Sequence, residues 1–219
     1  MFRRCILVVA VIAGMGLLTW LLPLFHIVPL DNARASKAAE KRVDPAVLAE
    51  HFWREQLPVE LAKAHDLRAV LEAIATDIQA ARHKYGRTVG ISSSFLVLVQ
   101  GSARVVSVDS KNVALSVRGD SSEPDVLVRA ALISGNSVRD VTGLLNMNDF
   151  ANSQDFNEIA MQLNRIVEER VLPEVRERAV VGQDLQFIGC AELTGNAKQQ
   201  KPLKAIPLRV NSRKPEQAK

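Results

Sequence analysis

The chain has 219 residues, of which 47% are hydrophobic and 24% are charged, and its formal net charge at pH 7 is +4. These proportions are typical of a globular protein with one core of ordinary size. The two cysteines, Cys5 and Cys190, are too few and too far apart for a disulfide framework, so disulfide-stabilised folds are excluded. Part of the positive charge lies at the two ends of the chain, which fits a membrane surface at least as well as nucleic acid.

An apolar segment dominates the N-terminal region. After Arg3 and Arg4, residues 5–25 are uncharged and almost wholly hydrophobic. This run is long enough to cross a bilayer as one helix, and longer than the core of a typical signal peptide. We therefore predict a transmembrane anchor or signal-like segment over residues 1–30, with the uncleaved anchor favoured. Basic residues ahead of a long apolar core usually set the orientation, so we expect a single-pass inner-membrane protein whose body faces the periplasm.

A single periplasmic domain is expected over residues 44–210, between a polar linker at 31–43 and a basic tail at 211–219. Its first part, residues 44–86, is predicted to be a helical hairpin, because apolar residues recur there at helical spacing. Its second part, residues 91–210, changes to runs rich in Val and Leu, which are typical of strands.

Aspartate, proline and glycine mark the ends of the two predicted helices. Asp44 and Pro45 are an N-cap followed by a proline at the first helical position, and Pro58 is expected to kink or break this first helix. The second helix is predicted to begin at Asp66 and to end at Gly86 as a left-handed cap.

The second part is predicted to form an OB-like β-barrel of five strands, with a helix between strands 3 and 4. The strand runs are residues 94–108, 113–117, 125–134, 183–193 and 203–210. A turn is expected at Asp109 to Asn112, and Gly101 is expected to mark a bulge or bend in the first strand. Three strands, a helix and two strands is the element order of an OB-type barrel, which makes the fold class α+β. A generic α+β sandwich is the alternative.

An amide-rich segment, residues 135–158, joins the third strand to the helix. Seven of its polar side chains are the candidate ligand-binding residues: Arg139, Asp140, Asn148, Asp149, Asn152, Gln154 and Asp155. Such side chains suit a sugar or a peptide, and Arg139 suits a carboxylate or phosphate. The alternative is that they hold an irregular loop together, with Asp140 paired to Arg139 and Asp155 capping the helix in a capping box with Glu158.

The sequence contains no recognisable catalytic or metal-binding constellation. No histidine follows His83, so the barrel lacks the imidazole that a Ser–His or Cys–His nucleophile needs. A calcium loop beginning at Asn146 would place Ala151 and Asn157 where an EF-hand needs Gly and Glu. We therefore predict no catalytic residues, no metal and no cofactor. Phe95 and Phe187 are the only aromatic residues in the strand runs, which argues against nucleic acid.

Several short motifs resemble a bacterial family of predicted periplasmic lipoproteins that is classified only as a domain of unknown function. Three of them are Ile27-Val28-Pro29, Phe52-Trp53 and Phe187-Ile188-Gly189-Cys190-Ala191-Glu192. The most distinctive lie in the amide-rich segment: Gly135-Asn136, Arg139-Asp140, Thr142-Gly143-Leu144, Asn148-Asp149-Phe150 and Asn152-Ser153-Gln154-Asp155-Phe156-Asn157. The resemblance covers residues 26–210 and implies an extracytoplasmic, membrane-attached protein, often encoded near sugar-uptake transporters, with no established activity. Lipidation needs a cysteine at the end of the apolar run, where this chain has Phe25, so a spanning helix would replace the lipid.

These observations lead to one main functional hypothesis and two alternatives. The main hypothesis is a non-catalytic accessory or binding module linked to a sugar-uptake transport system or to envelope assembly, with a transporter or envelope protein as partner. One alternative is a carboxylate-dependent hydrolase of envelope sugars that uses Asp140 and Asp155. The other is a small-ligand sensor that uses Arg139. The sequence leaves the oligomeric state open.

Overall fold

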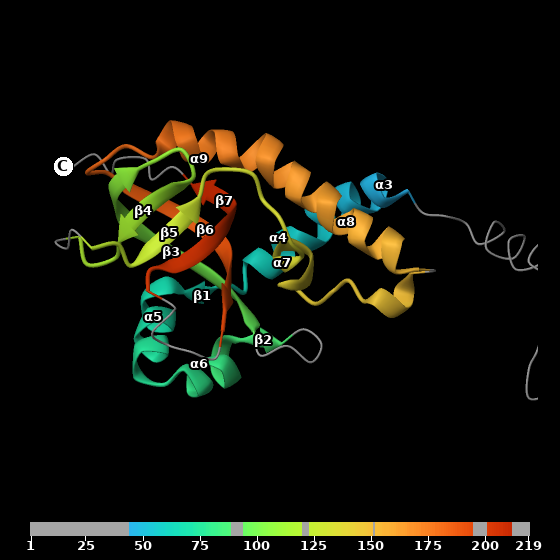
Figure 1. Ribbon diagram of the computed structural model, residues 1–219, viewed down its shortest axis with the longest axis horizontal. Coiled ribbons are helices and arrows are strands. Elements are labelled where there is room, and N and C mark those ends of the chain that lie inside the picture. Colours follow the sequence, from blue (N-terminus) through green and yellow to red (C-terminus); the bar gives the residue numbers. More distant parts are fainter. Residues whose placement is uncertain (1–43, 89–93, 120–122, 151, 195–200, 212–219) are drawn as a thin grey trace, which may run out of the picture. The chain divides into compact units, whose positions relative to one another are not determined.

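The computed structural model describes residues 44–88, 94–119, 123–150, 152–194 and 201–211 (Figure 1). The chain divides into two compact units, Met1–Arg42 and Val43–Lys219, and the described residues all belong to the second. The predicted anchor and linker, and the predicted tail beyond Asn211, lie outside the described residues. Within those residues, no helix combines the length and the apolar character that crossing a bilayer requires.

Five strands close into a barrel: β3 (Phe95–Val108), β4 (Asn112–Ser116), β5 (Val126–Arg129), β6 (Asp184–Leu193) and β7 (Leu203–Asn211). They pair in the order β3–β4–β5–β7–β6, and β6 pairs back with β3. The β5–β7 pair is parallel and the other pairs are antiparallel. This arrangement confirms the predicted α+β class and the five-stranded barrel.

The first barrel strand, β3, is long because it serves both halves of the barrel. Residues 95–104 pair with β6 without a break, and residues 104–108 pair with β4. The predicted bulge is not at Gly101, since the ladder runs straight through it, and the register shift lies between Val105 and Ser107. Gly101 is instead a point of close approach: a Cβ atom there would lie 2.8 Å from the Cβ atom of Leu67.

The third strand is shorter than the predicted run of residues 125–134. It ends at Arg129: the Ala130 N–H still donates to the Lys111 carbonyl at 2.8 Å, but the Ala130 carbonyl and the Ile133 N–H bond to helix side chains. The Ala130 carbonyl accepts from Nε and NH2 of Arg176, at 3.0 and 2.6 Å. The Ile133 N–H donates to Oε1 of Glu168 at 2.7 Å. The segment after β5 is thereby held over the barrel.

Two helical rods each contain a proline inside the rod, Pro58 in the first and Pro173 in the second. The first consists of α3 (Pro45–His51), the π-helical turn η1 (Phe52–Gln56) and α4 (Leu57–Leu61), and the second of α8 (Ser153–Ile166), the π-helical turn η3 (Val167–Val171) and α9 (Leu172–Arg178). In Figure 1, α9 lies over the barrel, and α8 extends beyond the barrel with α3 beside it.

The π turns explain why Pro58 does not break its helix. A proline inside an α-helix clashes with the carbonyl four residues earlier. Here each proline is preceded by a widened turn, in which the N–H of Leu57 or Leu172 donates to the carbonyl five residues back. The helix continues through both prolines, so the predicted break at Pro58 is replaced by a local widening.

The predicted second helix is two helices, α5 (Leu67–Thr76) and α6 (Ile78–Tyr85). Asp77 separates them with an extended backbone, and its carboxylate accepts from the first N–H groups of α6. Gly86 has a φ of −87°, so the predicted left-handed cap is wrong. A side chain at this position is excluded for another reason, because a Cβ atom would lie 2.6 Å from the Arg82 carbonyl oxygen and from the Phe95 ring.

Candidate functional site

Arg139 and Asp140, the first pair of predicted site residues, lie in the short helix α7 (Ser137–Asp140) and are buried. Arg139 donates to both carboxylate oxygens of Asp140, from Nε at 2.6 Å and from NH2 at 3.1 Å. Its NH1 donates to the Phe156 carbonyl at 3.0 Å, and the guanidinium lies 3.6 Å from the centroid of the Phe156 ring. These bonds fix α7 against the start of α8, so the pair is part of the domain core.

Asn152 and Asp155, a second pair, form the N-terminal cap of α8. The Asn152 Oδ1 accepts from the Asp155 N–H at 2.9 Å, and the Asn152 Nδ2 donates to the Asp155 carboxylate at 2.9 Å. The predicted capping box of Asp155 with Glu158 is therefore wrong. The N-cap lies three residues earlier, at Asn152, and Asp155 occupies the third helical position.

Replacing Asn152 with alanine is expected to lower the free energy of unfolding by about 1 kcal/mol, because α8 loses its capping acceptor. Urea unfolding followed by circular dichroism measures this. Gln154→Ala is the matched control: Gln154 is exposed on the same helical turn and is expected to change stability by less than about 0.5 kcal/mol. Equal effects of the two substitutions would contradict the assignment of the cap.

The remaining predicted residues, Asn148, Asp149 and Gln154, are exposed. Asn148 and Asp149 belong to the 3-10 turn η2 (Met147–Asp149), where the Asn146 side chain accepts from the Asn148 N–H at 3.0 Å. The seven candidates therefore occupy three different settings: a buried ion pair, a helix cap and an exposed surface. The structure does not gather them around one common point.

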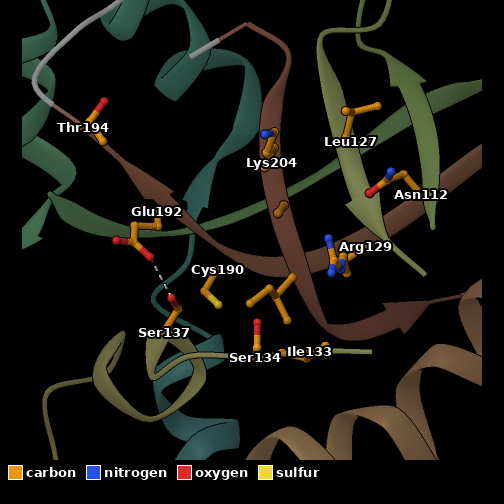
Figure 2. Close-up of a pocket in the computed structure, with 12 residues that line it drawn as sticks. Asn112, Leu127, Arg129, Ile133, Ser134, Ser137, Cys190, Glu192, Thr194 and Lys204 are labelled. Carbon is orange, nitrogen blue, oxygen red and sulfur yellow. Dashed lines mark hydrogen bonds between the residues drawn. The ribbon is translucent and has the colours of Figure 1, made fainter. Parts of the chain in front are cut away.

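A groove that the sequence did not indicate lies on the outer face of the barrel (Figure 2). It crosses β4, β5, β7 and β6 and is bordered by the segment that follows β5. Its volume is about 380 Å³, and its lining residues are Asn112, Leu127, Arg129, Ile133, Ser134, Ser137, Cys190, Glu192, Thr194, Lys204, Ala205 and Ile206. This volume lies within the usual range for small-ligand sites.

Strand alternation places the groove's side chains. In β5, Val126 and Val128 are buried, so Leu127 and Arg129 lie on the opposite face of the strand. Because β5 and β7 are parallel neighbours, with Leu127 opposite Lys204, residues from the third and fifth barrel strands lie side by side.

The polar groups of the groove are fixed by short contacts. The Ser137 hydroxyl donates to Oε2 of Glu192 at 3.1 Å, which joins α7 to β6. Arg129 donates from Nε and NH2 to the Leu132 carbonyl, at 3.2 and 3.1 Å, and so holds the bordering segment. Lys204 is exposed (Figure 2).

Cys190 lines the groove and is almost fully buried. Burial raises the pKa of its thiol to about 12, so the thiol stays protonated at physiological pH. A protonated, buried cysteine is a poor nucleophile and behaves as a small apolar residue. With Leu127 and Ile206 it makes the floor of the groove apolar.

The groove residues contain one carboxylate, Glu192, and no histidine. Acid–base hydrolysis of a glycosidic bond uses two carboxyl groups, so this lining does not supply that pair. Among the described residues, no group of three or more His, Cys, Asp or Glu side chains is placed to hold a metal ion. The arrangement is suited to binding a polar ligand over an apolar floor.

The closed order β3–β4–β5–β7–β6, with helices between the third and fourth strands, defines an OB-fold protein. The family model described as "predicted periplasmic lipoprotein (DUF2291)" matches residues 10–211, and the chain belongs to this family. The predicted resemblance is thus confirmed. The family description supports a membrane-attached periplasmic protein.

A solved structure shares the fold. The crystal structure of an OB-fold protein from Thermotoga maritima is similar to this chain with a TM-score of 0.70 and 28% sequence identity. The similarity covers 78% of this chain and 99% of that protein. None of the curated proteins compared with the chain matches it.

Proposed function

We propose that this protein is a non-catalytic binding module, anchored to the inner membrane through residues 5–25, that binds a saccharide in the groove and serves a sugar-uptake transport system. The family description supports the periplasmic location. Because the end of the apolar run is Phe25 and not a cysteine, we propose a single spanning helix for this chain in place of a lipid. A transporter of the same membrane is the proposed partner.

The observation that carries the proposal is the lining of the groove. In OB folds, the outer face of the second and third strands, with the adjoining loops, binds oligosaccharides or oligonucleotides. The corresponding strands here are β4 and β5, which contribute Asn112, Leu127 and Arg129 to the groove. An apolar floor suits the C–H face of a sugar ring, and the amide, carboxylate and hydroxyl groups around it suit the ring hydroxyls.

Nucleic acid is a poorer fit to the same groove. Binding of single-stranded nucleic acid depends on aromatic side chains on which bases stack. The groove's lining residues include no aromatic side chain, and the two strand phenylalanines, Phe95 and Phe187, are buried in the core. The proposal therefore commits to a saccharide.

Titration of the full-length protein in detergent with glucose, galactose, ribose and maltose tests the proposal. At least one sugar is expected to raise the thermal unfolding midpoint in a saturable way and to be recovered chemically unchanged. Glu192→Gln is expected to weaken that binding at least about tenfold, because a charged acceptor is lost from the groove.

Glu169→Gln is the matched control, since Glu169 is an exposed carboxylate on η3 that pairs with Arg165 away from the groove. It is expected to leave sugar affinity unchanged. Failure of all four sugars to bind would overturn the saccharide proposal, and turnover of the bound sugar would favour the hydrolase.

A further inference from the structure

A second recess, of about 620 Å³, lies where α4 and α6 approach β3. Its charged lining residues are Lys63, Lys84, Arg87 and Glu60, with His65 beside them. Glu60 is the one carboxylate among the lining residues, and it accepts from Nζ of Lys63 at 2.6 Å. The lining therefore carries an excess of positive charge, which favours an anionic group.

The basic side chains of this recess contact neighbouring residues. Arg87 belongs to the short strand β2 (Arg87–Thr88), which pairs with β3, so its backbone is fixed. Its guanidinium lies against Gly143, which has a φ of +65°. A Cβ atom on Gly143 would lie 2.1 Å from Nη1 of Arg87, so a side chain there would displace the guanidinium, and the positive φ independently favours glycine.

The neighbouring Lys84 is placed by an aromatic ring. Its Nζ lies 5.0 Å from the centroid of Tyr85, within the range of a cation–π contact. The ring of His65 packs edge-on against the same tyrosine, with the ring centroids 5.0 Å apart. Tyr85 thus contacts both a lysine and a histidine of the recess.

A third recess, of about 240 Å³, has lining residues in common with both other hollows and is also lined by Asp140. It shares Ser137 and Glu192 with the groove and Leu96 with the basic recess. The strand register explains this, because Leu96 of β3 is the direct partner of Glu192 of β6. The three hollows therefore follow one another across the paired strands β6 and β3.

We infer that the basic recess is an anion subsite, and that the ligand of the groove is a saccharide bearing a phosphate or carboxylate group that enters this recess. The inference rests on the proposed saccharide function of the groove. Arg87 offers a planar pair of donors to an oxyanion, and Lys84 offers a point charge beside it. The sugar would occupy the groove and its charged group would lie in the basic recess, since Arg87, Leu96 and Glu192 are successive partners across β2, β3 and β6.

Isothermal titration of the full-length protein in detergent tests the inference with four probes: inorganic phosphate, glucose, glucose 6-phosphate and glucuronate, each at matched ionic strength. Phosphate alone is expected to bind weakly but saturably. At least one of the two charged sugars is expected to bind at least about tenfold more tightly than glucose. The charged sugar that binds identifies whether phosphate or carboxylate is the natural group.

Arg87→Ala is expected to abolish that tenfold advantage and leave glucose binding unchanged, and Arg87→Lys is expected to retain part of it, because the charge remains without the planar fork. Arg165→Ala is the matched control, since Arg165 is an exposed arginine of α8. It is expected to change the affinity of none of the four probes. Arg87 is exposed, so the thermal midpoint of the unliganded variants is expected to match that of the parent.

Two outcomes separate the inference from the proposed function. Glucose binding with no phosphate binding and no preference for the charged sugars would overturn the anion subsite and leave the saccharide groove intact. Phosphate binding that Arg87→Ala removes, with no response to any sugar, would overturn the anionic saccharide together with the proposed function. Binding to vesicles of anionic lipid without response to free phosphate would likewise overturn the inference in favour of a membrane contact.

Discussion

Replacing Asp140 with alanine is expected to lower the free energy of unfolding by about 3 to 5 kcal/mol, because the substitution leaves a buried charge without its partner. Arg139 is only 4% exposed. Two of its nitrogens donate to the Asp140 carboxylate, and the space around it is occupied by Phe156 and the start of α8.

The double variant Arg139→Met with Asp140→Leu separates the charge effect from the loss of packing. Apolar side chains of similar volume often replace a buried ion pair at little cost, so this variant is expected to recover most of the stability that Asp140→Ala loses. Urea unfolding followed by circular dichroism measures both. A loss below about 1 kcal/mol for Asp140→Ala would contradict the structural role of the pair. A large loss would also mean that substitution of Asp140 is no clean test for hydrolase activity.

Replacing Phe52 with alanine is expected to lower the free energy of unfolding by about 3 to 5 kcal/mol, because it removes a fully buried aromatic side chain. Phe52 begins the π turn η1 and packs in the same core as the barrel strands. The helices at the start of the domain are thus expected to unfold together with the barrel in one cooperative transition.

Val59→Ala is the control for this substitution. Val59 lies in α4 and is 59% exposed, so its truncation is expected to change stability by less than about 0.5 kcal/mol. Thermal unfolding monitored by far-ultraviolet circular dichroism and by tryptophan fluorescence gives the comparison. A separate early transition for Phe52→Ala, with the barrel transition unmoved, would contradict a shared core.

The strands and their order could be predicted because their signals are local. Apolar residues cluster in runs bounded by turn residues, and Asp109 accepts from the N–H groups of Lys111 and Asn112 as its turn position suggests. The predicted pairing of Asp140 with Arg139 is observed, whereas the bond between Asn152 and Asp155 was not predicted.

The groove could not be predicted, because it depends on pairing between distant strands. Leu127 and Lys204 are neighbours only once β5 and β7 are aligned in parallel, and neither residue carries a motif. The prediction of the N-cap of α8 was wrong for a different reason. Asn152 and Asp155 are both good capping residues and lie three positions apart, so the local pattern allows either of them as the N-cap of the helix.

The π turns were missed because no residue type specifies them. Proline predicts a disturbance but not its form, and the surrounding packing selects a widened turn over a kink. The turn η3 also positions Arg170, which donates to both carboxylate oxygens of Glu50 in α3 at 3.0 and 2.8 Å. This contact lowers the pKa of Glu50 and ties the two proline-containing rods together.

The unbroken ladder between β3 and β6 has a consequence for how this domain meets other proteins. An edge strand has unpaired backbone N–H and C=O groups, which can pair with an extended segment of a ligand or of another, misfolded chain. Over the described part of the chain, each of the five barrel strands has partners on both sides. The proposed partner protein would therefore meet this domain mainly through side chains, loops or helices, and copies of the domain on one membrane would offer little strand edge for pairing with one another.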